Sequence, residues 1–177
     1  PDEAVMAPDA PRPAVARAGG APLPEPDRFY DPDYIPALAA MMAPIIAAEA
    51  PITLHRLARL VARRHRFQRT GREIVRVVRA VAEPLGQFVP APDGEEVIWM
   101  PTAEPVAIVP YRGGDIAGDP RQWTDVPYPE KLGFARDFVD HADAVRAMSA
   151  ALGLGRLTGT TREEFRALLA AVQRGSD

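Results

Sequence analysis

The chain has 177 residues, 47% of them hydrophobic and 25% charged, which is enough to bury a core in one or two small domains. It contains no cysteine, which excludes disulfide frameworks and cysteine-ligated metal sites. Because no apolar run reaches the length of a membrane span and no secretory leader pattern opens the sequence, we expect a cytoplasmic protein without a membrane partner.

The net charge of −3 hides an uneven charge distribution. Residues 35–112 carry ten bases and seven acids, whereas residues 1–34 carry three bases and seven acids. All basic residues except Lys131 are arginine. Such a bias fits a GC-rich coding sequence, so the placement of the arginines is more informative than their number. The centre of the chain is its basic part.

Residues 1–28 contain seven prolines and show no apolar periodicity. A segment of this kind cannot bury enough apolar surface to offset the entropy lost on ordering. We therefore predict a flexible, partly polyproline linker that acts as a tether. Because the chain begins with proline, we also expect it to be part of a longer or processed product.

Residues 29–112 are predicted to form a winged-helix-like unit. Its first helix is expected to start at the capping residue Asp33, to run to about Ala48 and to bend at Pro44. The apolar face of this helix comprises Leu38, Met41, Met42, Ile45 and Ile46.

Two further helices, joined by a tight turn, are predicted within residues 53–79. Thr53 is expected to cap the first, and Thr70 with Glu73 forms a capping-box pattern at the start of the second. The apolar positions recur at helical spacing: Leu54, Leu57, Ala58 and Val61, then Ile74, Val77, Val78 and Val81. The opposite faces are rich in arginine, with nine arginines against one glutamate in the stretch.

A β-hairpin is predicted next. Gln87–Val89 and Glu95–Trp99 are short extended runs, and Asp93-Gly94 between them is a hairpin signal. Three helices followed by a hairpin is the order of a winged helix, with the hairpin as the wing. The apolar run 105–111 either pairs with this hairpin or leads out of the unit. Trp99 is expected to be buried in the core.

Residues 113–128 are turn-rich and are predicted to be a connector, followed by a helical unit at 129–177. Three helices are expected there, at 130–140, 142–152 and 162–174. Thr161 and Glu164 suggest a capping box for the last, whose buried face comprises Phe165, Leu168, Leu169 and Val172. Because the motif T-G-R-E at 70–73 resembles T-G-T-T-R-E-E at 158–164, we predict a degenerate helical repeat and a mainly α fold.

The sequence contains no pattern that indicates catalysis, a cofactor or a metal site. His55, His65 and His141 lack carboxylates or cysteines at ligand spacing. The arginine cluster is the candidate site, because a helix-turn-helix presents these positions to a DNA groove. The predicted nucleic-acid-binding residues are Arg63, Arg64, Arg66, Arg69, Arg72, Arg76 and Arg79. The alternative is a solvated helix face.

Several short runs resemble the bacterial domain of unknown function 3320. They are Glu49 to Ile52, Leu57 to Arg63, Arg69 to Ile74, Ile98 to Pro101, and the closing element Leu152 to Leu157. That domain typically ends large superfamily-one helicase proteins that also carry a nuclease-like domain. The resemblance therefore implies an accessory module without catalytic residues of its own.

We accordingly expect a non-catalytic module that binds nucleic acid, most of all duplex DNA, for a parent helicase or nuclease-type protein. The alternative is a protein-interaction module that packs on the parent helicase core or on a partner protein. The two differ in the salt dependence of binding.

Overall fold

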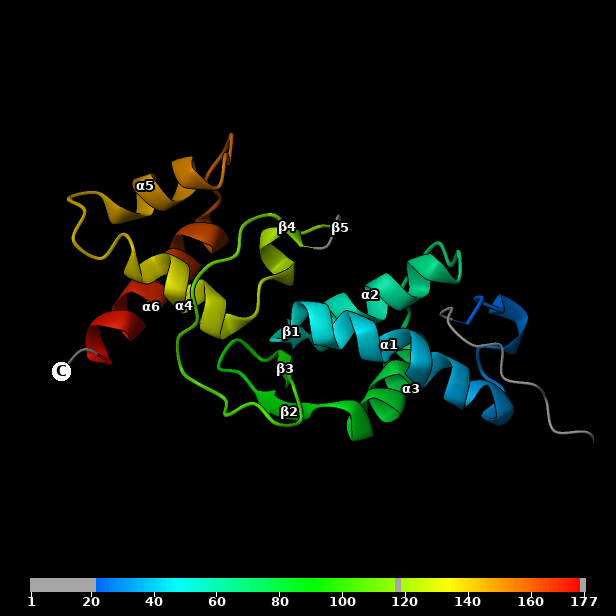
Figure 1. Ribbon diagram of the computed structural model, residues 1–177. Coiled ribbons are helices and arrows are strands. Elements are labelled where there is room, and N and C mark those ends of the chain that lie inside the picture. Colours follow the sequence, from blue (N-terminus) through cyan, green and yellow to red (C-terminus); the bar gives the residue numbers. More distant parts are fainter. Residues whose placement is uncertain (1–21, 117–118, 176–177) are drawn as a thin grey trace, which may run out of the picture.

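The computed structural model describes residues 22–116 and 119–175, so most of the predicted linker lies outside the described residues. Helices dominate, and a small antiparallel sheet accompanies them, which confirms the predicted mainly α class. Figure 1 shows two groups of helices, with a long irregular segment running between them. Within the described ranges, no helix combines the length and the apolar character needed to cross a bilayer.

The first group has helices and strands in alternation. It comprises α1 (Ile35–Glu49), β1 (Ile52–Thr53), α2 (Leu54–Arg64), α3 (Arg72–Ala82), β2 (Gln87–Pro90) and β3 (Glu96–Trp99). The strands are antiparallel in the order β1-β3-β2, with Ile98 opposite both Ile52 and Phe88. The core lies between the three helices and this sheet, and all five residues of the predicted apolar face of α1 are buried.

The predicted start of α1 is wrong, whereas that of α2 is confirmed. Asp33 lies inside a 3₁₀ turn, Pro32–Tyr34, and the residue before α1 is Tyr34, which makes no capping bond with its side chain. At α2, the Thr53 hydroxyl accepts a hydrogen bond from the Arg56 amide at 3.1 Å. The described part of the predicted linker also contacts this unit: the Glu25 amide donates to the Tyr34 hydroxyl at 2.8 Å, and the Arg28 guanidinium lies 5.6 Å from the centroid of the Tyr34 ring.

Both predicted capping boxes are wrong. Gly71 is the residue that precedes α3, so Thr70 lies one position too far from the helix to cap it. At the last helix the cap is Thr158, whose hydroxyl accepts from the Thr161 amide at 3.2 Å. The shared T-G motif therefore occupies different positions at the two helix starts, and the predicted repeat stays a prediction.

The hairpin is confirmed and gains a third strand. β2 pairs with β3, and Gly94 in the turn has φ of +86°, a left-handed conformation that favours glycine. β1 was not predicted, because two residues are too few to show a period. The apolar run 105–111 forms no strand; it leads to the second group, where Ile108 and Tyr111 pack on the core.

The second group consists of α4 (Tyr128–Arg136), α5 (Ala144–Ala151) and α6 (Gly159–Arg174), which confirms the three predicted helices. α6 packs mainly on α4. Of the residues predicted to be buried on α6, only Leu169 remains partly exposed. The predicted connector contains two short paired strands, β4 (Asp115–Ile116) and β5 (Asp119–Pro120), and a 3₁₀ turn, Trp123–Asp125.

A glycine in the middle of α4 marks where the irregular segment crosses this helix. A Cβ atom on Gly133 would overlap with the Val109 carbonyl oxygen. The Val109 amide in turn donates to the Pro129 carbonyl at 3.0 Å. The helix and the segment can approach this closely only because Gly133 has no side chain.

Replacing Gly133 with alanine should lower the free energy of unfolding by about 1 to 3 kcal/mol, because the backbone oxygen must be displaced. On helix propensity alone the same change would stabilise by about 1 kcal/mol. Gly159→Ala is the control, since nothing lies within 4 Å of the position that a Cβ atom would take there. Urea denaturation of both variants measures the difference, and a stabilised Gly133→Ala protein would contradict the crossing.

Candidate nucleic-acid interface

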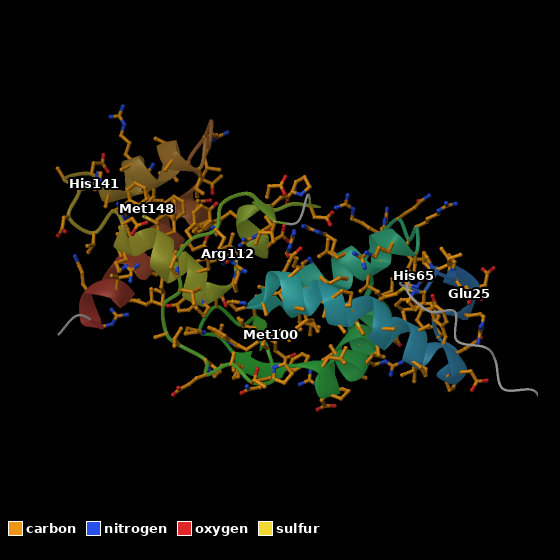
Figure 2. The ribbon with its side chains drawn as sticks, in the orientation of Figure 1. Glu25, His65, Met100, Arg112, His141 and Met148 are labelled. Carbon is orange, nitrogen blue, oxygen red and sulfur yellow. The ribbon has the colours of Figure 1, made fainter. Side chains whose placement is uncertain are left out.

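The turn between α2 and α3 is held by an aromatic cluster around His65. His65 is buried; its Nδ1 lies 2.8 Å from the Val61 carbonyl oxygen and its Nε2 lies 3.0 Å from the Tyr34 hydroxyl. The rings of Phe29 and Phe67 pack beside it. Figure 2 shows His65 close to Glu25, whose amide donates to the Tyr34 hydroxyl at 2.8 Å. This cluster fixes the turn that carries the predicted arginines.

Arg79 is half-exposed and has a carboxylate partner on the hairpin. Its guanidinium donates two hydrogen bonds of 2.9 Å to the Glu96 carboxylate and lies 5.1 Å from the Phe88 ring centroid. The hydrogen bond to Glu96, and then its charge, raise the pKa of Arg79 above the ordinary value. Arg79 therefore joins α3 to the hairpin through a two-bond ion pair.

Two other predicted arginines have carboxylate partners at the surface. Arg63 lies 3.6 Å from Asp119, and Arg76 lies 2.9 Å from Glu73. Glu73 thus pairs with a side chain one turn on and does not cap α3. Surface pairs of this kind contribute about 0 to 1 kcal/mol, so a phosphate could compete for either arginine.

The remaining four predicted arginines lie at the turn and at the start of α3, and together they are called the basic patch below. These are Arg64, Arg66, Arg69 and Arg72, all exposed. None of the four makes an ion pair with a described residue, and Arg64 donates only to the Met41 carbonyl at 3.3 Å. Arg66 has φ of +58°, in the left-handed region, and the next amide, that of Phe67, donates to the Ala62 carbonyl at 2.9 Å and closes the end of α2. The four lie within nine residues of sequence, from the last residue of α2 to the first residue of α3.

Arg56 and Glu49 form a buried ion pair that the sequence patterns did not predict. Arg56 is 1% and Glu49 3% exposed, and the guanidinium donates to the carboxylate at 2.5 and 3.0 Å. The assignment of Arg56 to the arginine-rich solvent face of α2 is therefore wrong. A signal was present, because Glu49 follows the buried Ile45 by four residues and Arg56 precedes the buried Leu60 by four.

This pair belongs to a larger ionic cluster at the junction of the two helical groups. Arg112 donates to the Glu130 carboxylate at 2.7 and 3.1 Å and to the carbonyls of Glu49, Ala50 and Pro51. Figure 2 shows Arg112 between the two groups. The other cluster contacts are Arg121 with Glu130 at 3.0 Å, Arg59 with Asp125, and Lys131 with Asp93 and Glu164. The connector thus holds the groups together.

The three histidines do not form a common site. His55 and His141 are exposed, while His65 is engaged in the aromatic cluster. Across residues 22–116 and 119–175, no group of three His, Asp or Glu side chains gathers as metal ligands would.

Residues 27–76 match a family described as "Protein of unknown function (DUF3320)". Neither the curated proteins nor the solved structures provide a match to the chain. The matched residues run from the turn before α1 into α3 and include the basic patch. The match supports the resemblance to the domain of unknown function 3320 over these residues.

Proposed function

We propose that this chain is a non-catalytic accessory module that binds nucleic acid, specifically duplex DNA, through the α2–α3 turn and the start of α3. The observation that carries the proposal is the basic patch. Four arginines from one short stretch are exposed there and have no carboxylate partner among the described residues. Unpaired arginines in a cluster attract a polyanion and release its counterions on binding.

The order of the elements supports the proposal. We infer a winged helix from the order helix, strand, helix, helix and two-stranded hairpin, with the strands in the order β1-β3-β2. In a helix-turn-helix the second helix of the pair enters the major groove with its N-terminal residues. In this chain that helix is α3. Arg72 is its first residue, and Arg69 lies three residues before it.

The biological setting is inferred from the family resemblance. We infer that the module positions a helicase or nuclease-type parent on DNA in the cytoplasm. The family match over residues 27–76 supports only the resemblance from which this setting is drawn. Because few amide side chains lie on α3, binding should depend little on base sequence.

Fluorescence anisotropy with labelled duplex and single-stranded DNA at several salt concentrations tests the proposal. If about four phosphates are neutralised, the slope of log affinity against log salt should be about −3 to −4 for the duplex. The variant Arg66→Ala/Arg69→Ala/Arg72→Ala should reduce the magnitude of this slope by about 2 to 3. The charge-matched control is Arg136→Ala/Arg156→Ala/Arg174→Ala in the second group.

Equal binding by wild type and the patch variant would contradict the proposal. So would the absence of duplex binding at low salt. Either result would favour the alternative, a protein-interaction module that packs on the parent enzyme or on a partner protein.

A further inference from the structure

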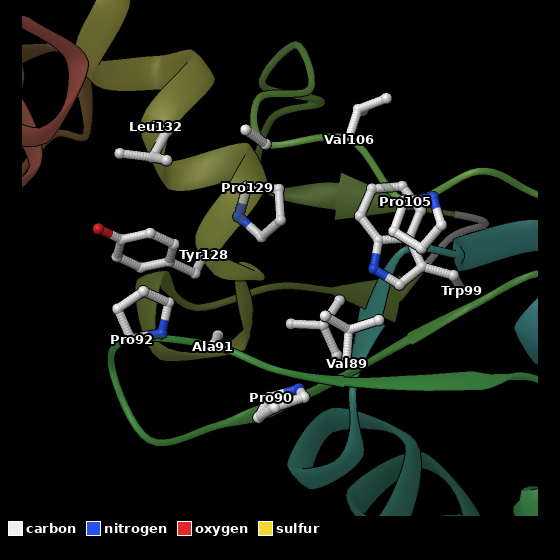
Figure 3. A pocket seen from close by; sticks show the side chains of 12 residues that line it. Val89, Pro90, Ala91, Pro92, Trp99, Pro105, Val106, Tyr128, Pro129 and Leu132 are labelled. Carbon is white, nitrogen blue, oxygen red and sulfur yellow. The ribbon is translucent and has the colours of Figure 1, made fainter. Parts of the chain in front are cut away.

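The pockets of this chain differ in the chemistry of their walls. Figure 3 shows the pocket between the hairpin and the start of α4, whose described lining residues are apolar or aromatic and carry no charge. Trp99 lines it, while the indole N–H of this residue is buried and has no hydrogen-bond partner among the described residues. A pocket of about 410 Å³ on the second helical group is different, because three of its six described lining residues are arginines.

This arginine pocket lies between α5 and α6. Arg146 is the third residue of α5, and Arg162 and Arg166 lie about one turn apart on the same face of α6. Val145 and Leu157 form its apolar base, since both pack on the core of the second group. Two helices thus bring three guanidinium groups to the edge of one hollow.

The three arginines have no counter-charge within the described part of the chain. All three are exposed, and their side chains make no ion pair or hydrogen bond with a described residue. Asp143 is the only carboxylate among the described lining residues, and its Oδ1 accepts from the Arg146 amide at 3.1 Å as the cap of α5. Three positive charges and one negative charge give the lining a net charge of +2.

These positions are unfavourable for arginine in the absence of an anion. Arg162 and Arg166 are like charges four residues apart, an arrangement that destabilises a helix. Arg146 and Arg162 also lie near the N-termini of their helices, where the macrodipole favours negative charge and opposes positive charge. An anion in the pocket would offset both effects.

We propose that the arginine pocket binds the terminal phosphate of a small phosphorylated molecule, such as a nucleotide. The guanidinium fork matches two phosphate oxygens at once. A phosphate monoester carries about −1.5 to −2 charges at pH 7 and balances the net charge of the lining, whereas each phosphodiester of DNA carries only about one negative charge. The rest of the molecule contacts Val145 and Leu157. The proposal is independent of the basic patch and of DNA binding.

Isothermal titration calorimetry of the full chain with pyrophosphate tests this proposal. Wild type should bind pyrophosphate, and the variant Arg146→Gln/Arg162→Gln/Arg166→Gln should bind it at least about tenfold more weakly, because three charged donors are lost. The matched control, Arg136→Gln/Arg156→Gln/Arg174→Gln, removes three exposed arginines of the second group that do not line the pocket. It should retain the wild-type affinity, as should the basic-patch variant Arg66→Ala/Arg69→Ala/Arg72→Ala.

The stability of the pocket variant is a second measurement. Without pyrophosphate its melting temperature should equal or exceed that of wild type, because the variant loses no internal contact and relieves like-charge repulsion. Pyrophosphate should raise the melting temperature of wild type and not that of the variant. A pocket variant that melts earlier or fails to fold would overturn the proposal, since the arginines would then have a structural role.

Three binding results would also overturn it. One is the absence of pyrophosphate binding by wild type at low salt. Another is an equal loss of affinity in the control variant or in the basic-patch variant, which would indicate general attraction to positive charge. The third is a pocket variant that binds pyrophosphate as wild type does and loses affinity only for labelled duplex DNA, which would assign the pocket to phosphodiesters. The effect of the basic-patch variant on duplex binding is measured separately.

Discussion

Replacing Glu130 with alanine is expected to lower the free energy of unfolding by about 3 to 5 kcal/mol. Glu130 is fully buried and receives three hydrogen bonds from Arg112 as well as the charge of Arg121. Without the carboxylate, the buried guanidinium of Arg121 would have no counter-charge among the described residues. Leaving one partner of a buried pair uncompensated costs far more than the pair contributes.

The same change should weaken the coupling between the two helical groups. Arg112 is anchored by Glu130 on one side and bonds the carbonyls of Glu49, Ala50 and Pro51 on the other. Losing that anchor removes a direct link between α4 and the end of α1. Chemical denaturation followed by tryptophan fluorescence and by circular dichroism should then show transitions that no longer coincide.

Glu73→Ala is the matched control, since it removes a glutamate whose partner Arg76 is at the surface. That pair has side chains exposed by 68% and 69%, so the change should cost no more than about 1 kcal/mol. A Glu130→Ala protein as stable as wild type would show that the ionic cluster does not hold the groups together.

Val78→Asp should have an effect of comparable size, lowering the free energy of unfolding by more than about 4 kcal/mol. Val78 is 0% exposed and belongs to the core formed by α1, α2, α3 and the sheet. An aspartate there would be buried among apolar side chains without a partner. The first helical group would lose its structure.

Thermal denaturation of Val78→Asp beside Ala80→Asp measures this effect. Ala80 is exposed two residues further along α3, so its substitution changes charge and helix propensity without burying the carboxylate. A melting temperature for Val78→Asp equal to that of Ala80→Asp would show that the buried face of α3 is assigned to the wrong residues.

Local patterns predicted the helices and most of the core. The apolar period of 3.6 residues predicted α1, α2, α3 and the buried face of α6. A helix that buries one face has apolar residues three and four positions apart, so the pattern can be recognised within a short stretch of sequence. Asp93-Gly94 placed the hairpin for the same reason. Trp99 was expected in the core and is buried there, although its unpartnered N–H could not be foreseen.

The candidate site was predicted only in part. The sequence located the arginines on α2, the turn and α3. Whether each is free depends on a partner elsewhere, as with Arg79 and Glu96, which are 17 residues apart. Periodicity cannot reveal such a partner, because the hairpin must first fold back on α3. The capping predictions failed on a smaller scale, since a shift of one residue decides which hydroxyl reaches the first amides.

By itself, the sequence determined that this chain folds into two sets of amphipathic helices with a basic stretch in the first. Only the tertiary structure decided how those sets are joined. Arg112 reaches the carbonyl of Glu49 across 63 residues of sequence, and Gly133 admits the backbone of Val109. Contacts of this kind arise from the path of an irregular segment, which has no repeating pattern. They can be recognised only when distant residues lie side by side.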